Sequence, residues 1–528
     1  ASHEQFWAAH VTLMTRSHTL TEDDLDAVAD TLGLAQLDPT AATEVAERAR
    51  RRVDLDIDSA LASGVRFTPT FFINGRRYDG PWDESSFTDA MLGSLGHRVR
   101  TAALSFASWA PSAGVLLLLA SVLAIALINS SLGPGFEAFW QTRLALAFGG
   151  AEFHMPLLQW INDALLTIFF LVVGLEIKRE FTVGHLASRR AAALPVAAAL
   201  GGMAVPACIY LALVPPGPWA PGWGVPMATD TAFAVALIAM LGARVPVELR
   251  IFLTAAAIVD DIGAIVVVAV FYSGALHAGY LAAAVLIVAG LALMNQSGIY
   301  RLTPYLLAGV ALWACVHAGG LHATLAGVVL ATLIPTRLPP DYGTLAMQAE
   351  TILMAEAQHG GEQFRRGPSA PALQALDAIH DRLESPADRM LRTVAPRSSY
   401  LVLPVFALAN AGVALGTDIF SRHGMLAAAI VAALAIGKPL GFVLASAAAV
   451  RLRLAHKPGA YTWRQLAGAG ALAGIGFTMS LFIAGQAFPL AGDFAVAKIA
   501  VFAASVLSSV IGVAVLWGAP APVQGADA

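Results

Sequence analysis

The sequence predicts a polytopic helical membrane protein preceded by a small α/β segment. The 528 residues are 57% hydrophobic and 13% charged, about half the charged fraction that is usual for soluble domains. Apolar runs long enough to cross a bilayer recur between residues 113 and 518. Residues 1–100 differ from these runs, because they combine acidic helical patterns with a short strand-like stretch.

Charge and cysteine content exclude several classes of protein. The net charge is only -4 and no basic tract is present, which argues against a nucleic-acid partner. Cys208 and Cys315 lie far apart in apolar runs, and the sequence contains no CxxC. A dithiol redox site and a cysteine zinc site are therefore excluded, and we expect both cysteines to be small buried hydrophobes.

The first 100 residues show two helical patterns, LTEDDLDAVADTLGL and ATEVAERARRRVDLDIDSALASG, followed by RFTPTFFINGRRYDG. Asn74-Gly75 between apolar runs is a strong hairpin signal, and Thr68-Pro69-Thr70 suggests a constrained, cis proline. This block resembles the C-terminal half of a DsbA-like thioredoxin domain, without the first strand and the helix that bears CxxC. Two alternatives stay open: a truncated fusion, which we favour because the chain opens ASHEQFW without Met, or a degenerate docking module.

Twelve apolar runs are candidate membrane spans, and Lys and Arg are concentrated in the even-numbered connections between them. This bias predicts that both termini are cytoplasmic. The long connection 336–398 reads as an amphipathic cytoplasmic hairpin or as a flexible insertion, and the sequence favours neither. The predicted spans are 113–132, 156–176, 192–214, 226–242, 248–272, 278–294, 303–317, 322–335, 399–415, 424–450, 466–487 and 495–518.

The stretch 226–272 carries the chemistry. Asp260 and Asp261 are adjacent in an otherwise apolar run, and Asp230 follows Thr229 near the start of the preceding run. Charged groups at bilayer depth are costly and persist mainly where they pair, face a cavity or carry ions. Adjacent aspartates repel when both are ionised, so the pair can hold either a proton or a hard cation. This pattern suits proton-coupled transport of a small cation.

Two spans read as helices that are broken in mid-membrane. Pro226 and Thr229-Asp230 interrupt the fourth span, and the GIGFT sequence 474–478 interrupts the eleventh. Transporters with inverted repeats place their ion site at such paired breaks. Because half-helix ends carry partial charges, we expect Asp230 to serve the positive ends and Lys438, one of four lysines in the chain, to serve the negative ends.

Seven sequence words, in order, resemble the NhaA family of sodium/proton antiporters. They are WINDALLTIFFLVVGLEIKRE (160–180), ATDTAFA (228–234), AIVDDIGAIVV (257–267), GLHATLAGV (320–328), LPVFALANAGV (403–413), IGKPLG (436–441) and AGIGFTMSLFIA (473–484). The resemblance implies domains at 1–100 and 101–528, an all-α membrane domain of twelve helices with inverted repeats, and two broken helices that cross. It implies pH-regulated, electrogenic exchange of Na⁺ or Li⁺ for protons across a bacterial inner membrane, without enzymatic activity or a cofactor. Membrane lipid surrounds such a protein, and a homodimer is an open expectation.

Site residues follow from the resemblance position by position. Asp260 and Asp261 match the pair that binds the transported cation and exchanges protons, and Lys438 matches the lysine that pairs with the first of them. Asp230 and Thr229 match the acid and hydroxyl at the broken span, and Asp163 matches a supporting acid in the second span. A cytoplasmic cluster associated with pH regulation corresponds to Glu176, Lys178, Arg179 and Glu180. Its other half departs from the family pattern, with Asp388 and Leu391 where a base and an acid are expected.

Simpler structural roles stand beside these. Asp230 could be a helix N-cap, which is compatible with function, and Asp163 could be a polar residue at the outer interface. Residues 176–180 could be an ordinary cytoplasmic flank. We expect His317 and His322 to be satisfied polar groups rather than ligands. Two other function classes are a passive cation channel and a membrane thiol relay, and the second lacks the paired cysteines it needs.

Overall fold

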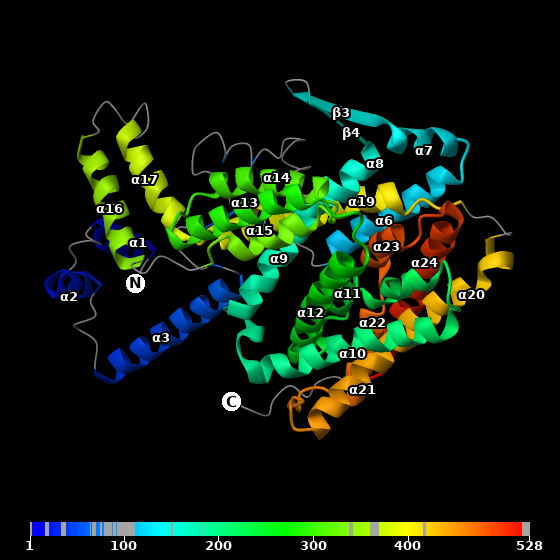
Figure 1. The fold of residues 1–528 in the computed structure, drawn as a ribbon. Coiled ribbons are helices and arrows are strands. Elements are labelled where there is room, and N and C mark those ends of the chain that lie inside the picture. The colour runs from blue at the N-terminus through cyan, green and yellow to red at the C-terminus, as the bar shows by residue number, and fades with distance from the viewer. Residues whose placement is uncertain are drawn as a thin grey trace. The chain divides into compact units, whose positions relative to one another are not determined.

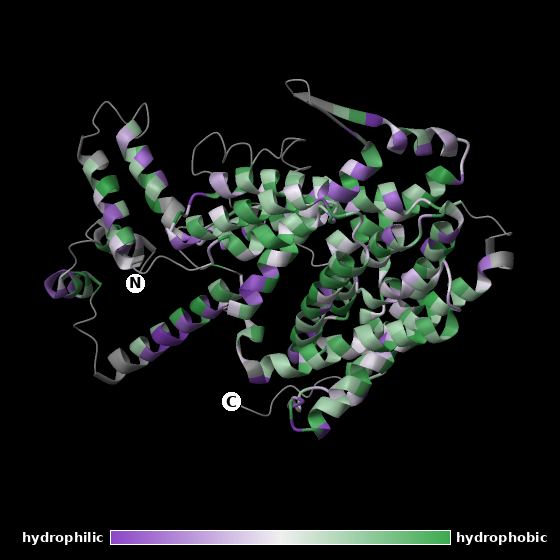
Figure 2. Cartoon of the chain, viewed as in Figure 1, coloured by the Kyte–Doolittle hydropathy of each residue, from purple (hydrophilic) through white to green (hydrophobic). Residues whose placement is uncertain are grey.

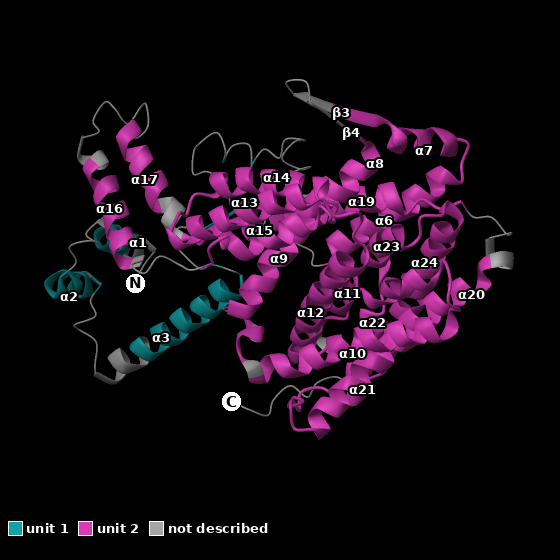
Figure 3. Ribbon diagram, viewed as in Figure 1, with its two compact units in different colours: residues 1–104 teal, residues 105–528 magenta. Residues whose placement is uncertain are grey.

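A computed structural model describes residues 3–15, 21–32, 39–63, 65, 70–73, 76–78, 87, 91, 111–148, 151–182, 184–336, 342–359, 369–414 and 419–519. Contacts divide the chain into two compact units, residues 1–104 and 105–528 (Figure 3). The first unit is small and polar, whereas the second is dominated by apolar helices (Figure 2).

The N-terminal unit contains α1 (His3–Thr15), α2 (Glu22–Thr31), α3 (Pro39–Ala62) and the strands β1 (Phe71–Ile73) and β2 (Arg76–Tyr78). Thr21 starts α2 through a capping box, in which its hydroxyl accepts from the Asp24 N–H and its own N–H donates to the Asp24 carboxylate. The two strands pair antiparallel with Phe71 opposite Tyr78, which confirms the predicted hairpin strands. The predicted turn at Asn74-Gly75 and the proline at Pro69 lie outside the described residues. The thioredoxin-like assignment of this unit stays a prediction.

The larger unit is built from helices, many of them long and apolar (Figure 1). Each of the twelve predicted spans coincides with a helical segment, but length and composition alone identify fewer crossings. Among the described residues, seven helices are long and apolar enough to cross a membrane, or up to nine spans if two bent pairs are included. The helices are α6 (Ser112–Ile128), α7 (Gly133–Gln141), α8 (Leu157–Trp160), α9 (Leu166–Thr182), α10 (Arg189–Leu213), α11 (Thr231–Met240), α12 (Val247–Phe271), α13 (Ala278–Gln296), α14 (Leu302–Ala318), α15 (Leu325–Leu333), α16 (Tyr342–His359), α17 (Ala370–Leu383), α18 (Pro386–Arg397), α19 (Leu403–Asn410), α20 (Ile419–Ala432), α21 (Lys438–Arg451), α22 (Trp463–Ala473), α23 (Phe477–Ala487) and α24 (Ala491–Trp517).

A β-hairpin in the membrane unit corrects the all-α expectation. Strand β3 (Arg143–Phe148) pairs antiparallel with β4 (Ala151–Pro156), and both follow α7 (Figure 1). The sequence RLALAF alternates large and small apolar side chains and is followed by Gly149-Gly150, a common hairpin signal. The prediction missed it because the stretch was treated as a connection between two spans.

The connection 336–398 is largely helical in its described part. Helices α16 and α17 pack against each other, and α18 follows directly. Ser369 caps α17 by accepting from the Ala372 N–H, and Ser385 caps α18 in the same way with Asp388. Of the two alternatives, the helical hairpin therefore fits better, although residues 360–368 lie outside the described part.

Helix α21 packs closely along α10, which fixes the position of Lys438 at the start of α21. A Cβ on Gly201 would meet the Gly441 carbonyl and Ala445, and a Cβ on Gly441 would meet the Gly201 carbonyl. The two backbones can approach this closely only because both positions lack a side chain. Phe442 lies fully buried beside this contact, next to Gly202 and Gly470.

Candidate ion-exchange site

The two interrupted spans meet at their interruptions. The first is a 3₁₀ turn, η4 (Ala220–Met227), followed by α11 after a break at residues 228–230. The second is the pair α22 and α23, which are bent by 48° across residues 474–476. The Asp230 N–H donates to the Ile475 carbonyl at 2.6 Å, and the Thr229 hydroxyl donates to the Ala473 carbonyl at 2.8 Å. Backbone groups freed by each break are therefore partly satisfied by the other.

The Asp230 carboxylate caps two helices at once. One oxygen accepts from the Phe233 N–H at 3.2 Å, in the first turn of α11. The other accepts from the Thr478 N–H at 3.1 Å and the Thr478 hydroxyl at 2.6 Å, in the first turn of α23. Asp230 is therefore a helix N-cap, which was the simpler structural role expected for it. Its negative charge also lies at the positive ends of both half-helices.

Helix α12 brings Asp260 and Asp261 beside this crossing. Both are buried, with 0% and 5% of the residue exposed. Successive residues on a helix point about 100° apart, so the two carboxylates face different neighbours. Asp261 accepts from the Thr231 hydroxyl at 3.1 Å, whereas Asp260 faces Lys438. One oxygen of Asp260, Oδ1, is buried and has no hydrogen-bond partner among the described residues.

Lys438 links the pair to the break. Its ammonium group lies 2.7 Å from Asp260 Oδ2, with both side chains fully buried, and it also donates to the Met227 carbonyl at the end of η4. The charge thus lies at the negative end of a half-helix, as the half-helix argument requires. A π-helical turn, Ala433–Gly437, directly precedes Lys438, and such turns are frequent at functional sites.

The buried charges do not balance within this cluster. Asp230, Asp260 and Asp261 face one ammonium group, and the Coulomb interaction of Asp261 with Asp260 and Asp230 is repulsive. An uncompensated carboxylate in a low-dielectric interior is strongly disfavoured. The cluster therefore needs a proton or a bound cation, and the unpartnered Asp260 oxygen is a place where either could bind.

Asp163 lies outside this cluster, in a π-helical turn (Ile161–Leu165) between α8 and α9. Its carboxylate accepts from the Gln159 amide at 3.2 Å and is 3.7 Å from His317 Nδ1. His322 Nε2 lies 2.7 Å from the Tyr272 carbonyl, consistent with a satisfied polar group. His317 has a carboxylate as its neighbour, which is likewise consistent with a satisfied polar group.

Residues 176–180 lie at the far end of the same helix. Lys178 donates to the Thr332 carbonyl at 2.8 Å and to the Ile334 carbonyl, which places its charge at the C-terminus of α15. Arg179 lies 3.6 Å from Asp388, whose position departs from the family pattern. Leu391 is buried in an apolar cluster and contributes no charge. Glu176 and Arg179 are exposed, and Glu180 is half-buried.

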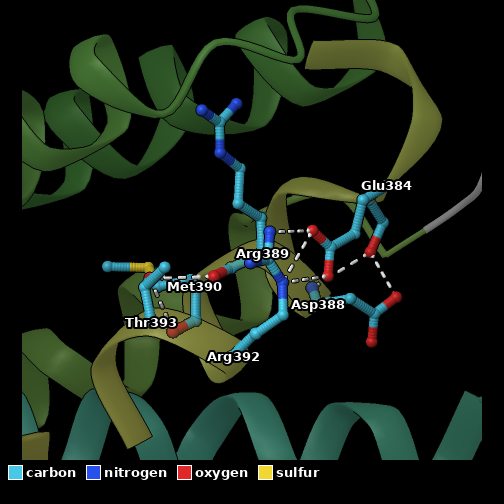
Figure 4. Close-up of polar contacts among 7 residues, drawn as sticks. Glu384, Asp388, Arg389, Met390, Arg392 and Thr393 are labelled. Carbon is cyan, nitrogen blue, oxygen red and sulfur yellow. Dashed lines mark hydrogen bonds and ion pairs between the residues drawn. The ribbon is translucent and has the colours of Figure 1, made fainter. Parts of the chain in front are cut away.

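Helix α18 has its own ion pair beside Asp388. Arg392 approaches Glu384 in a fork, with 2.7 Å between Nη2 and Oε2, as Figure 4 shows. The hydrogen bonds that Arg392 donates to Glu384 raise the pKa of the arginine above its usual value. The two ion pairs, Arg179–Asp388 and Arg392–Glu384, join α18 to α9 and to the C-terminal cap of α17.

Sequence reasoning missed two residues that contact the acids. Thr231 and Thr478 are the first and second residues of the helices that follow the two interruptions, which is a signal that could have been used. A separate polar group lies outside the crossing and has no comparable sequence signal: Asp493 at the start of α24 accepts from Trp219 at 2.9 Å and lies 3.2 Å from His423. Lys498, on the same helix, donates to the Gly412 carbonyl at 3.0 Å.

Comparison with known proteins identifies the family. The family described as Na⁺/H⁺ antiporter 1 matches residues 105–516. A Nitrosospira multiformis protein named Na(+)/H(+) antiporter NhaA is 63% identical over 98% of this chain and 85% of its own length. Proteins of the same name from Helicobacter pylori and Rhodopirellula baltica are 41% and 40% identical, over 76% and 78% of this chain and 92% and 93% of their own lengths. The chain is therefore a member of the Na⁺/H⁺ antiporter 1 family.

Proposed function

We propose that this protein is a multi-pass secondary transporter, not an enzyme, that exchanges Na⁺ for protons. The observation that carries the proposal is the buried Asp260–Lys438 pair beside Asp261, where two interrupted spans meet. Membership of the antiporter family supports the same reading. Li⁺ is a second proposed cargo, because it is a small cation that also prefers oxygen ligands.

In this proposal Asp260 and Asp261 bind either protons or the cation. When the carboxylates lose their protons, the cation binds their oxygens together with a Thr229 or Thr231 hydroxyl or a carbonyl of the breaks. Lys438 competes for Asp260, so cation binding breaks that ion pair. Because the two carboxylates repel each other, they titrate as a coupled pair, and the competition between proton and cation is steep.

The surroundings extend the proposal. We infer twelve crossings, made of the long helices, the two bent pairs and the shorter helices α14, α15 and α19, in an inverted-repeat arrangement in the inner membrane. The excess of Lys and Arg in alternate connections supports cytoplasmic termini. Exchange of more than one proton per Na⁺ would make it electrogenic, and a homodimer is the proposed assembly. Residues 1–100 are a proposed thioredoxin-like segment.

Regulation by pH is proposed for the charged cluster that joins α9 and α18. The ion pair between Arg179 and Asp388 supports a link between the two helices. Since Leu391 replaces the expected acid and Asp388 the expected base, the pH at which this protein becomes active should differ from that of relatives with the usual pattern.

The test uses proteoliposomes with a preformed proton gradient. Adding NaCl or LiCl should dissipate the gradient for the wild type but not for Asp260→Asn or Asp261→Asn. The control is Asp493→Asn, another buried acid that lies outside the crossing and should keep exchange. Robust exchange by both site variants would refute the site assignment. A cation current without proton movement would instead favour a passive channel.

A further inference from the structure

A polar pocket lies at the N-terminal end of the α8–α9 helix, at the opposite end from residues 176–180. Its volume is about 390 Å³, and Asp163, His317, His322 and Asn162 are among its lining residues. The side chains of His317 and Asp163 are 24% and 17% exposed, so water reaches both. The pocket is distinct from the Asp260 cluster, whose side chains are buried.

A carboxylate and an indole ring lie against His317. Its Nδ1 is 3.7 Å from Asp163 Oδ2. The Trp313 ring stacks on the imidazole with 5.8 Å between ring centroids and planes 14° apart. The Trp160 ring stacks on Trp313 with 6.0 Å between centroids. Trp313 Nε1 donates to the Asp163 carbonyl at 3.0 Å, which fixes the indole between the two. A protonated imidazole at this place is attracted by both the carboxylate and the indole face.

The other titratable groups near His317 and Asp163 either have other partners or are exposed. His322, before α15, interacts with Asp163 but is bonded to the Tyr272 carbonyl at the end of α12. The Tyr272 hydroxyl donates to the Pro221 carbonyl. His277 and Tyr280 at the start of α13 and His154 on β4 are exposed. Among the described residues, Asp163 is therefore the carboxylate that His317 faces.

An apolar layer separates the pocket from the central acids. Tyr272 follows Asp261 by eleven positions on one helix, which corresponds to about 16 Å along the axis. Between them, Val268 packs with Phe170, Met479 and Phe482 around a cavity of only about 10 Å³. The Phe482 ring in turn contacts His322 at 6.5 Å. The pocket is thus a solvent-accessible space on one side of a closely packed apolar layer.

We propose that His317 and Asp163 form a second proton-binding site, which collects protons on the side where this pocket opens and holds them near the route to Asp260 and Asp261. A hydronium ion gives its proton to the neutral imidazole, and the imidazolium is retained by Asp163. On release the proton returns to pocket water and continues to a central carboxylate once the apolar layer parts. The inference rests on the exchange function proposed above and adds a residue to it.

The test compares the full-length wild type with His317→Asn and with His277→Asn, an exposed histidine near the pocket. Na⁺ flux is measured in right-side-out and inverted membrane vesicles while the pH on one side is varied and the other is fixed. When the pH on the pocket side is varied, His317→Asn should need about fivefold more protons for half-maximal rate, the effect expected from losing a partly screened ion pair. Its KM for Na⁺ should not change, and His277→Asn should match the wild type.

Each outcome of these measurements either supports or refutes the second proton-binding site. An unchanged proton requirement in His317→Asn refutes the second site. Loss of all flux, a changed KM for Na⁺, or an equal shift from both sides also refutes it, because these indicate a structural role. Trp313→Phe should raise the proton requirement in the same direction as His317→Asn but by less. If Trp313→Phe leaves the proton requirement unchanged, the stacking argument is contradicted. If the wild type moves no Na⁺, the exchange function itself fails, and this inference falls with it.

Discussion

Single side chains at the crossing replace backbone and charge partners that the interrupted helices lack. Asp230 serves the N-termini of α11 and α23, and Lys438 serves the C-terminal end of η4 while it pairs with Asp260. Removing one member of a buried ion pair leaves an uncompensated charge, whereas removing both can be nearly neutral. The stabilisation from Lys438 and Asp260 is therefore expected to be an interaction energy between them, not the sum of two independent contributions.

A double-mutant cycle tests this coupling. Lys438→Ala should destabilise the protein by about 3–5 kcal/mol because Asp260 is left without its counter-charge. Adding Asp260→Asn should recover much of that loss. Thermal unfolding in detergent measures each variant, with Lys457→Ala, outside the spans, as the control. Strictly additive effects of the two substitutions would show that the pair is not energetically coupled.

At the level of elements, the position of the site depends on how closely helices approach. Helix α21 carries Lys438 in its first turn, and it can lie against α10 only because Gly201 and Gly441 face each other. Interiors are close-packed, so an added methyl group must move a backbone here. A shift of α21 would displace the ammonium from Asp260.

Gly441→Ala tests the close approach. The new methyl group would overlap the Gly201 carbonyl, and overpacking of this kind costs about 1–3 kcal/mol. Both the unfolding temperature and Na⁺ exchange should fall. Gly290→Ala in α13 is the matched control, since a Cβ there meets nothing within 4 Å and alanine favours a helix. If both variants behave alike, the packing of α10 on α21 does not position Lys438.

The whole chain joins a transporter unit to a segment with a different composition. The family match begins at residue 105, and the two contact units divide at residue 104. The Nitrosospira relative aligns with 98% of this chain, so its match extends over the segment, whereas the Helicobacter relative covers 76%. The segment therefore has a counterpart in the Nitrosospira relative and lies outside the residues that the family matches.

Deleting residues 1–104 should leave Na⁺-dependent proton movement intact, because the site and its supporting helices lie in the second unit. The measurement is the gradient-dissipation assay on the shortened chain in proteoliposomes. Asp260→Asn in the same shortened chain serves as the inactive reference. Loss of exchange in a shortened chain that still folds and inserts would assign the segment a direct role in transport.

Much of this structure could be predicted from the sequence, because a bilayer restricts which residues and backbone conformations can lie within it. Apolar runs, acids at membrane depth and breaks at glycine and proline are local properties, so the helices and Asp230, Asp260, Asp261 and Lys438 could be selected from sequence. The hairpin β3–β4 was also readable, from its alternation and glycine turn, and was overlooked. The twelve crossings stay a prediction, because α14, α15 and α19, which coincide with three of the predicted spans, are shorter than the helix length that identifies a span in the structure.

What only the tertiary structure decided is which distant residues meet. Asp230 and Thr478 are 248 positions apart, Lys438 and Asp260 are 178 apart, and Asp163 meets His317 from another helix. A resemblance named the second pair, but spacing along the chain could not have found the first or the third. Such contacts depend on how helices cross, and crossing is fixed by packing of whole faces and by the need to satisfy freed backbone groups, neither of which is written in any short stretch.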